Sequence, residues 1–285
     1  MLEQKNLSIV IPSLGGSKLE NTLNFIYNKK IRPLETIICI PKSYKKKIIL
    51  PKKINPKIIK TKIKGQVFQR LEGFKKARGK YVLQLDDDIK INNHCLNKLL
   101  ETVSKNRDIS ISPLLVDIKN KYSHFDIKPK NYLFRTYHYL LNGIQGYKPG
   151  NISKAGVPYM FEKKKKKIYE VEWLPGGCIL HRRKNLIKKN YFKFKSDKAF
   201  CEDLFHSFYL RKKKIKLFMD TSIKCDFDSF KGFKTLSFFD SLNLLFQDFK
   251  IRFFFIRLTK KNPYRMIFYY FILFLRLNYI FLKKF

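Results

Sequence analysis

Three consecutive carboxylates, Asp86, Asp87 and Asp88, are the strongest chemical feature of the sequence. They directly follow the apolar run from Tyr81 to Leu85, which is typical of a buried strand. Adjacent carboxylates repel one another, and only 22 of the 285 residues are acidic, so this cluster indicates a bound cation. Mg²⁺ and Mn²⁺ take oxygen ligands and usually bind one or two carboxylates together with substrate phosphates. We therefore predict a divalent-metal site here; the alternative is a solvated turn in which one Asp caps the next helix.

Other residues could carry chemistry beside this cluster. Glu202 and Asp203 form a second acidic pair just inside a predicted helix, where carboxylates also stabilise the helix dipole. Gly176 and Gly177 indicate either a turn or a place where a substrate approaches the backbone closely. Arg70, on a predicted helix, could hold a phosphate or could simply be solvated.

The elements that must position these residues alternate between strand and helix. This alternation predicts an α/β fold with a mostly parallel sheet covered by helices. In such sheets ligands bind just outside the carboxyl ends of the strands, which is where the three aspartates fall. The region 119–168 is predicted to be irregular, and residues 157–161 and 168–173 are predicted to pair as a hairpin. The other predicted strands are residues 7–11, 35–40, 57–64, 81–85 and 109–116, and the predicted helices are residues 19–27, 65–78, 96–103 and 199–213.

Composition bounds the class of protein. Apolar residues make up 45% of the chain, which excludes a largely disordered polypeptide. Lys and Arg number 61 against 22 Asp and Glu, a formal charge of +39, which favours an anionic partner: nucleic acid, a membrane surface or a phosphorylated substrate. The alternative is codon bias, because AT-rich codons encode the abundant Lys, Ile, Asn, Phe and Tyr. Five scattered cysteines without a C-x-x-C pair suit a reducing cytosol.

The end of the chain is basic and aromatic. Residues 249–285 hold nine Lys and Arg and no acidic residue. The longest apolar run there, from Met266 to Leu275, is shorter than the roughly 20 residues that cross a bilayer. No signal peptide is recognised at the start. We therefore expect a helical tail over residues 237–285 that attaches a cytoplasmic protein to the inner face of the cell membrane; the alternative is a tail that packs on the rest of the chain or self-associates.

Taken together and in order, these features resemble a family 2 glycosyltransferase of the GT-A fold. The resemblance spans roughly residues 7–225. It rests on the segments S-I-V-I-P-S at 8–13, the helix carrying Arg70, Y-V-L-Q-L-D-D-D at 81–88, W-L-P-G-G-C-I-L-H-R-R at 173–183 and C-E-D-L at 201–204.

The resemblance implies a role for each candidate residue. Asp203 would be the general base, and Asp88 with Asp86 would hold Mg²⁺ or Mn²⁺. Glu202, Gly176 and Gly177 would lie on the acceptor side. The nucleotide-sugar donor would be bound by Pro12, Ser13, Gln66, Arg70, Asp86 and Asp87.

The resemblance also implies which part of the chain binds the donor and which part lies on the acceptor side. A glycosyltransferase domain would cover residues 1–236, with a nucleotide-sugar-binding half at 1–118 and an acceptor-side half at 119–236. The expected reaction is the inverting transfer of a single sugar to a saccharide or lipid-linked acceptor, in bacterial cell-surface polysaccharide or lipopolysaccharide synthesis. The Q-x-x-R-W signature of processive synthases is absent. The family's acidic residue after the second strand is replaced by Ile40-Pro41-Lys42-Ser43, which leaves the donor nucleotide open.

Two other functions stay open on the sequence alone. A sugar-1-phosphate nucleotidylyltransferase has a related sheet, but it needs a glycine-rich loop with Arg and Lys after the first strand, and residues 13–18 match this poorly. A non-enzymatic nucleic-acid-binding protein would suit the charge, but it leaves the three aspartates unexplained, because carboxylates repel phosphates.

Overall fold

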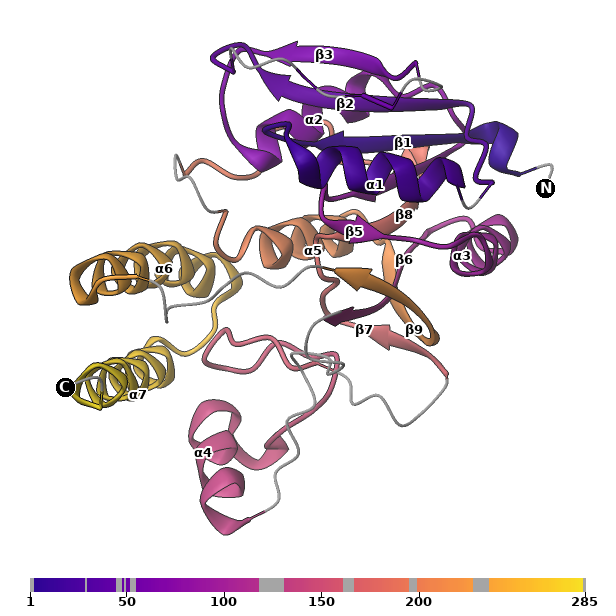
Figure 1. Cartoon of the computed structure of the whole chain (residues 1–285). Helices are drawn as coiled ribbons and strands as arrows, with labels where there is room; N and C mark the ends of the chain where they lie inside the picture. The colour runs from indigo at the N-terminus through magenta and orange to yellow at the C-terminus, as the bar shows by residue number, and fades with distance from the viewer. Residues whose placement is uncertain are drawn as a thin grey trace. The chain divides into compact units, whose positions relative to one another are not determined.

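The computed structural model describes residues 3–28, 30–44, 48, 50–51, 55–117, 131–160, 167–194, 199–227 and 236–283. The chain divides into two compact units, which are drawn in Figure 1. The first unit combines residues 1–124 with 163–228, and the second combines residues 125–162 with 229–285.

The first unit is built on one sheet, with the strand order β3-β2-β1-β4-β8-β6-β9-β5 and β7 paired to β9. Strands β1 to β4 run parallel to one another, whereas β8 is antiparallel to both β4 and β6, so the sheet is mixed. The strands are β1 (Leu7–Pro12), β2 (Glu35–Pro41), β3 (Lys57–Thr61), β4 (Tyr81–Leu85), β5 (Ile89–Lys90), β6 (Ile109–Asp117), β7 (Ile168–Val171), β8 (Cys178–Arg182) and β9 (Lys216–Phe227).

Helices cover both faces of this sheet. Apolar side chains of α1 (Ser17–Asn28) and α3 (Asn93–Lys105) share one buried cluster with alternate residues of β1 and β2. On the opposite face, Gly73 of α2 (Gln66–Lys76) lies against Val10 and Cys39. His206 of α5 (Glu202–Lys212) lies on the same face, next to His181 of β8. The predicted α/β class with a helix-covered sheet is confirmed.

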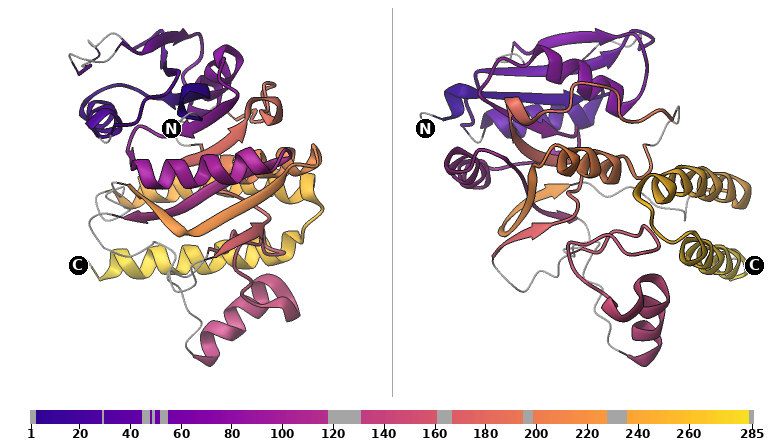
Figure 2. Two further views of the ribbon diagram at one scale, coloured as in Figure 1. Left: turned by 90° about the vertical axis from the view of Figure 1, so that its right-hand side faces the viewer. Right: turned by 180° about the vertical axis from the view of Figure 1, so that it is seen from behind.

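The second unit is helical. It contains α4 (Tyr132–Asn142), α6 (Phe238–Thr259) and α7 (Pro263–Leu282), and Figure 2 shows α6 and α7 side by side. Ile256, Met266 and Tyr270 form the centre of its core. The guanidinium of Arg252 donates to the Gly156 carbonyl at 2.7 Å, so the tail packs on the segment 131–160.

The structure differs from three expectations drawn from the sequence. Residues 157–161 and 168–173 do not form a hairpin: β7 pairs antiparallel with β9, and Pro158 makes only an isolated bridge with Ile152, while residue 161 lies outside the described residues. The region 119–168, predicted to be irregular, contains α4. The tail is also not too short to cross a bilayer, because α7 is 20 residues long with a mean hydropathy of 1.4, despite its arginines. The division at residues 118 and 236 into functional halves and tail stays a prediction.

Candidate active site

A pocket of about 350 Å³ opens in the first unit at the carboxyl end of β1. Parallel strands bring their carboxyl ends to one edge, so the loop after β1 and the start of α2 meet the turn after β4. Lys18 and Lys64 add two cations to its wall. The predicted donor-binding residues that line it are Pro12, Ser13, Gln66 and Asp87.

Ser13 is fixed from several sides. Its hydroxyl donates to the Asp87 carboxylate and accepts from the Gly15 N–H at 2.8 Å. The amide of Gln69 donates to the Ser13 carbonyl at 2.8 Å and to the Cys39 carbonyl at 2.6 Å, which ties the ends of β1 and β2 to α2. The pocket wall is therefore held in place by buried hydrogen bonds.

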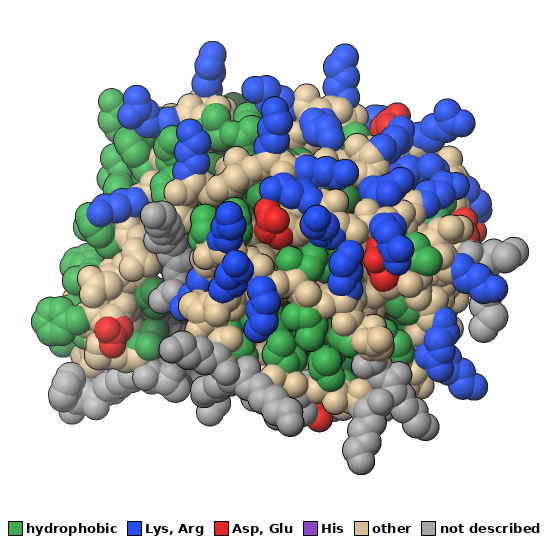
Figure 3. Space-filling view, turned by 90° about the horizontal axis from the view of Figure 1, so that it is seen from above, with side chains coloured by type: hydrophobic (Ala, Val, Ile, Leu, Met, Phe, Trp, Pro, Cys, Tyr) green, Lys and Arg blue, Asp and Glu red, His purple; other side chains and the backbone are tan. Residues whose placement is uncertain are grey.

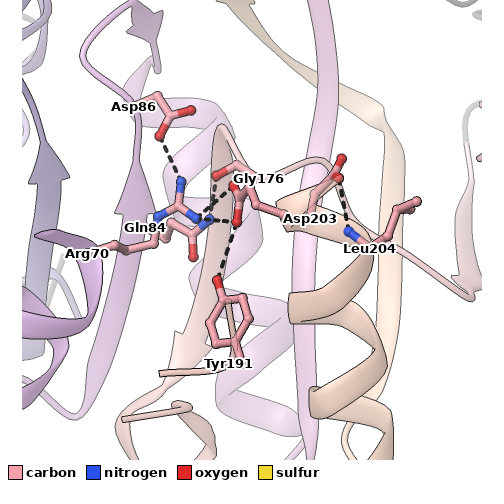
Figure 4. Close-up of polar contacts among 8 residues, drawn as sticks. Arg70, Gln84, Asp86, Gly176, Tyr191, Asp203 and Leu204 are labelled. Carbon is pink, nitrogen blue, oxygen red and sulfur yellow. Dashed lines mark hydrogen bonds and ion pairs between the residues drawn. The ribbon is translucent and has the colours of Figure 1, made fainter. Parts of the chain in front are cut away.

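Arg70 joins the two acidic clusters (Figure 4). Its side chain is 1% exposed, and one guanidinium nitrogen contacts both carboxylate oxygens of Glu202 at 2.8 and 2.9 Å. Another contacts Asp86 at 3.1 Å. The Tyr191 hydroxyl donates to Glu202 at 3.3 Å. A buried cation thus links the turn after β4 to the start of α5.

Burial and charge shift the pKa values in this network. Burial raises the pKa of Asp86 to about 7, against the opposing effect of Arg70, and the neighbouring Glu202 and Asp88 raise it further. Burial disfavours the charged form of Arg70, but the carboxylates of Glu202 and Asp86 outweigh it and raise the Arg70 pKa. Burial also raises the pKa of Asp87, partly offset by the hydrogen bond from Ser13.

The glycine pair stands next to this network. A Cβ at Gly176 would collide with the Glu202 carboxylate, so glycine is required there for the carboxylate to reach Arg70. The Gly176 carbonyl accepts from the side chain of Gln84, and the Gly177 carbonyl accepts from the Asp86 N–H at 2.8 Å. The predicted acceptor-side glycines therefore lie directly beside the carboxylate turn.

Asp203 lies in the first turn of α5. One of its carboxylate oxygens accepts from the Leu204 N–H at 2.9 Å (Figure 4). Its Cβ is 3.7 Å from the position that a Cβ on Gly176 would take. Its neighbour Glu202 is the ion-pair partner of Arg70, and the predicted acceptor contact of Glu202 stays a prediction.

The carboxylates suit a divalent cation by their chemistry. No group of three or more His, Cys, Asp and Glu side chains that could hold a metal is found in the described part of the chain. All three carboxylates have protein partners: Asp86 contacts Arg70, Asp87 accepts from Ser13, and Asp88, which is 29% exposed, contacts the Lys18 ammonium at 3.3 Å. These residues fit a cation held by one or two carboxylates together with substrate phosphates, which is how Mg²⁺ commonly binds.

Three residues that hold the site were not predicted from the sequence: Gln69, Gln84 and Tyr191. Gln84 had a signal, because it is a polar side chain within an otherwise apolar buried strand. Gln69 lies on the same turn of α2 as Gln66 and Arg70, which is a weaker indication. Nothing near Tyr191 in the sequence indicates its contact with Glu202.

The helix-covered sheet, with a pocket and a carboxylate turn at the carboxyl ends of its strands, has a GT-A fold. Residues 8–188 match the model of Glycosyl transferase family 2. This match covers more than half of the chain, and the chain belongs to that family. The predicted family and fold are therefore confirmed.

Comparison with solved structures agrees on the fold. The chain is similar to the crystal structure of GalNAc-T7 with UDP, GalNAc and Mn²⁺, with a TM-score of 0.54 and 19% sequence identity. The similarity covers 78% of this chain and 44% of that one, so this chain spans less than half the length of that relative. None of the curated proteins matches the chain.

Proposed function

We propose that this glycosyltransferase moves a single sugar from a nucleoside-diphosphate sugar to an acceptor hydroxyl, with inversion at the anomeric carbon. One observation carries the proposal: Pro12, Ser13, Gln66 and Asp87, four residues expected to bind the donor, line one pocket. The two lysines of that pocket suit the two phosphates of the donor. The UDP bound to the GalNAc-T7 structure supports a donor of this class.

The chemistry then follows from the residues around the pocket. Asp203 accepts the proton of the acceptor hydroxyl as that oxygen bonds to the anomeric carbon. The bond from this carbon to the diphosphate breaks on the opposite face, which inverts the configuration. Arg70 keeps Asp86 and Glu202 in place between the two substrates. A divalent cation at Asp88, with Asp86 near it, would offset the charge that builds on the departing diphosphate.

The proposal includes a location at the cytoplasmic face of a bacterial membrane, in the synthesis of a cell-surface polysaccharide. Large apolar side chains of α7 are exposed, including Ile267, Phe271 and Phe274. On the face drawn in Figure 3, Lys and Arg side chains are spread widely, with a few carboxylates between them. Helix α7 itself carries Arg265 and Arg276, and exposed apolar side chains with cations on one helix suit an anionic membrane surface.

A donor screen tests the proposed reaction. The full chain is incubated with single nucleoside-diphosphate sugars, with and without Mn²⁺, and release of the nucleoside diphosphate is measured. We expect release from at least one donor only when the cation is present. Release of pyrophosphate from a nucleoside triphosphate and a sugar phosphate would instead identify a nucleotidylyltransferase.

A further inference from the structure

The second unit contains a pocket of its own, of about 520 Å³, between α4, the segment 147–160 and α7. This volume lies within the range of small-molecule sites. Most of its lining side chains are aliphatic or aromatic, such as Leu141, Met160 and Leu273. None of the described residues that line it is acidic, and one of them, Arg276, is a cation. The lining therefore suits an apolar ligand with an anionic group.

His138 supplies the second observation. Its ring lies among aromatic rings, with centroids 4.6 Å from Phe134, 4.9 Å from Tyr147 and 5.1 Å from Tyr159. The side chain lines the pocket and His138 is 6% exposed, yet neither ring nitrogen has a hydrogen-bond partner among the described residues. Buried polar groups are nearly always paired, and an unpaired one costs about 1–3 kcal/mol. A ligand oxygen in the pocket would satisfy this imidazole.

Two other buried histidines differ from His138 in their surroundings. One ring nitrogen of His181 and both of His206 are also unpaired among the described residues, but neither ring lines the donor pocket or this one. Burial lowers the pKa of His138 to about 4, so its ring is neutral near pH 7 and has one donor and one acceptor nitrogen. Burial also raises the pKa of Tyr137, the residue directly before His138, and the charge of Arg276 opposes that rise. The charge of Arg276 is therefore felt at the residue next to His138.

We propose that this pocket binds a lipid phosphate: its hydrocarbon chain lies against the aliphatic and aromatic wall, and its polar oxygens reach His138 and Arg276. The surroundings support an amphiphile over a free sugar. Tyr132 and Leu133 at the start of α4 are 81% and 77% exposed, and Leu275 on α7 is 48% exposed. These side chains would meet the same bilayer from which a lipid chain would enter. This inference depends on the proposed membrane location in one respect: the membrane is the source of the lipid ligand.

Calorimetric titration of the full chain tests the pocket without donor, acceptor or bilayer. The probes are dodecyl phosphate below its micellar concentration, inorganic phosphate and glucose 6-phosphate. We expect dodecyl phosphate to bind at least tenfold more tightly than either chain-free phosphate. Equal affinity for glucose 6-phosphate would overturn the proposal, because the site would then recognise a sugar. A failure here would leave the glycosyl-transfer proposal untouched, since the donor screen does not use this pocket.

Matched variants locate the binding. Leu273→Trp fills the pocket and should abolish binding, whereas Leu275→Trp on the exposed side of the same helix should preserve it. His138→Phe keeps the ring packing and should weaken binding about tenfold, the value of one hydrogen bond near 1.4 kcal/mol. A histidine that only packs against its neighbours would leave the affinity unchanged when replaced by Phe. Undiminished binding to both Leu273→Trp and His138→Phe, each folded by circular dichroism, would place the ligand elsewhere.

The same titration separates two sources of the lipid. Farnesyl phosphate represents a lipid-linked acceptor, and a lysophosphatidylglycerol represents a membrane phospholipid. Tighter binding of the first assigns the pocket to the acceptor, and tighter binding of the second assigns it to membrane anchoring. Binding of neither, with dodecyl phosphate also inactive, overturns the proposal.

Discussion

Asp203 combines a hydrogen bond to the Leu204 N–H with a place beside the glycine pair. Asp203→Asn should preserve this hydrogen bond but cannot accept a proton. We expect turnover to fall roughly 10²–10⁴-fold, the usual contribution of a general base, with donor binding unchanged. Initial rates and donor titrations check this, with the exposed Asp108→Asn as the control. A loss smaller than threefold would assign Asp203 to helix capping.

Asp88 is the carboxylate of the cluster that is most open to a cation. Asp88→Ala should abolish transfer. Asp86→Ala should weaken donor binding, because the variant lacks the carboxylate that contacts Arg70. Lys18→Ala removes the ammonium 3.3 Å from Asp88 and should weaken donor binding, because Lys18 lines the donor pocket, while the remaining transfer should still depend on the cation. Release of the nucleoside diphosphate with and without a chelator is the measurement. Full activity of Asp88→Ala, or indifference of the wild type to the chelator, would refute the metal assignment.

At the residue scale, the sequence predicts which residues belong to the site, but it predicts their contact partners less well. The aspartate cluster and the glycine pair are visible because such residues are unusual directly beside buried strands. The partners of Arg70 are not visible, because Glu202 lies 132 positions further along the chain. A contact at that separation depends on the order of the strands, which no local pattern encodes.

At the scale of elements, α2 and α5 are joined through the ion pair of Arg70 and Glu202, both almost fully buried. Arg70→Met leaves the Glu202 charge without its cation, so we expect unfolding free energy to fall by about 3–5 kcal/mol. The double variant Arg70→Met/Glu202→Leu should recover part of this loss, because the Glu202 charge is removed together with its cation, whereas Asp86 still loses its contact with Arg70. Urea unfolding curves measure both. A single variant as stable as the wild type would mean that water reaches the carboxylate.

The elements themselves were predicted where the chain has a local signal. Runs such as Leu7–Pro12 and Glu35–Pro41 are apolar and end at a proline. The helix predicted over residues 96–103 is longer, because α3 begins at Asn93. Its N-cap is Asn92, not an aspartate, and the Asn92 side chain accepts from the Cys95 N–H. The predicted hairpin failed because β7 pairs with β9, far along the sequence. The length of α7 was underestimated because Arg276 interrupts its apolar run, whereas a helix accommodates one charge without ending.

For the whole molecule, buried histidines predict a dependence of stability on pH. Burial lowers the pKa of His138 to about 4 and that of His181 to about 3, and burial also lowers the pKa of His206. An unfolded histidine takes up its proton near pH 6.5, so between there and pH 4 the unfolded chain binds more protons. Stability should therefore fall on acidification, by about 1.4 kcal/mol per pH unit for each histidine. Urea midpoints between pH 7 and 5 should fall less steeply in His206→Phe; parallel slopes would contradict this.

The second prediction for the whole molecule concerns attachment to a membrane. Full-length protein should co-sediment with anionic vesicles in a salt-sensitive way, because each basic residue near the surface contributes about 1 kcal/mol. Replacing Ile267, Phe271 and Phe274 by Gln should release it. Replacing the equally exposed Leu34 and Ile58 of the first unit should not. Sedimentation that resists both high salt and alkaline extraction would mean that α7 crosses the bilayer.

The place of β8 between β4 and β6 has a consequence for synthesis on the ribosome. When residues 1–117 have emerged, β4 and β6 each present an unpaired edge, because the strand that joins them is still to be translated. The edge of β4 then presents unpaired backbone N–H and C=O groups between side chains that are buried in the finished sheet, so it is prone to pair with another chain. Domains tend to fold from the N-terminus as they emerge, so this half must wait for β8 before its sheet can close. We expect nascent chains that stop before Cys178 to aggregate or recruit chaperones, and chains that extend past Arg182 to become protease-resistant.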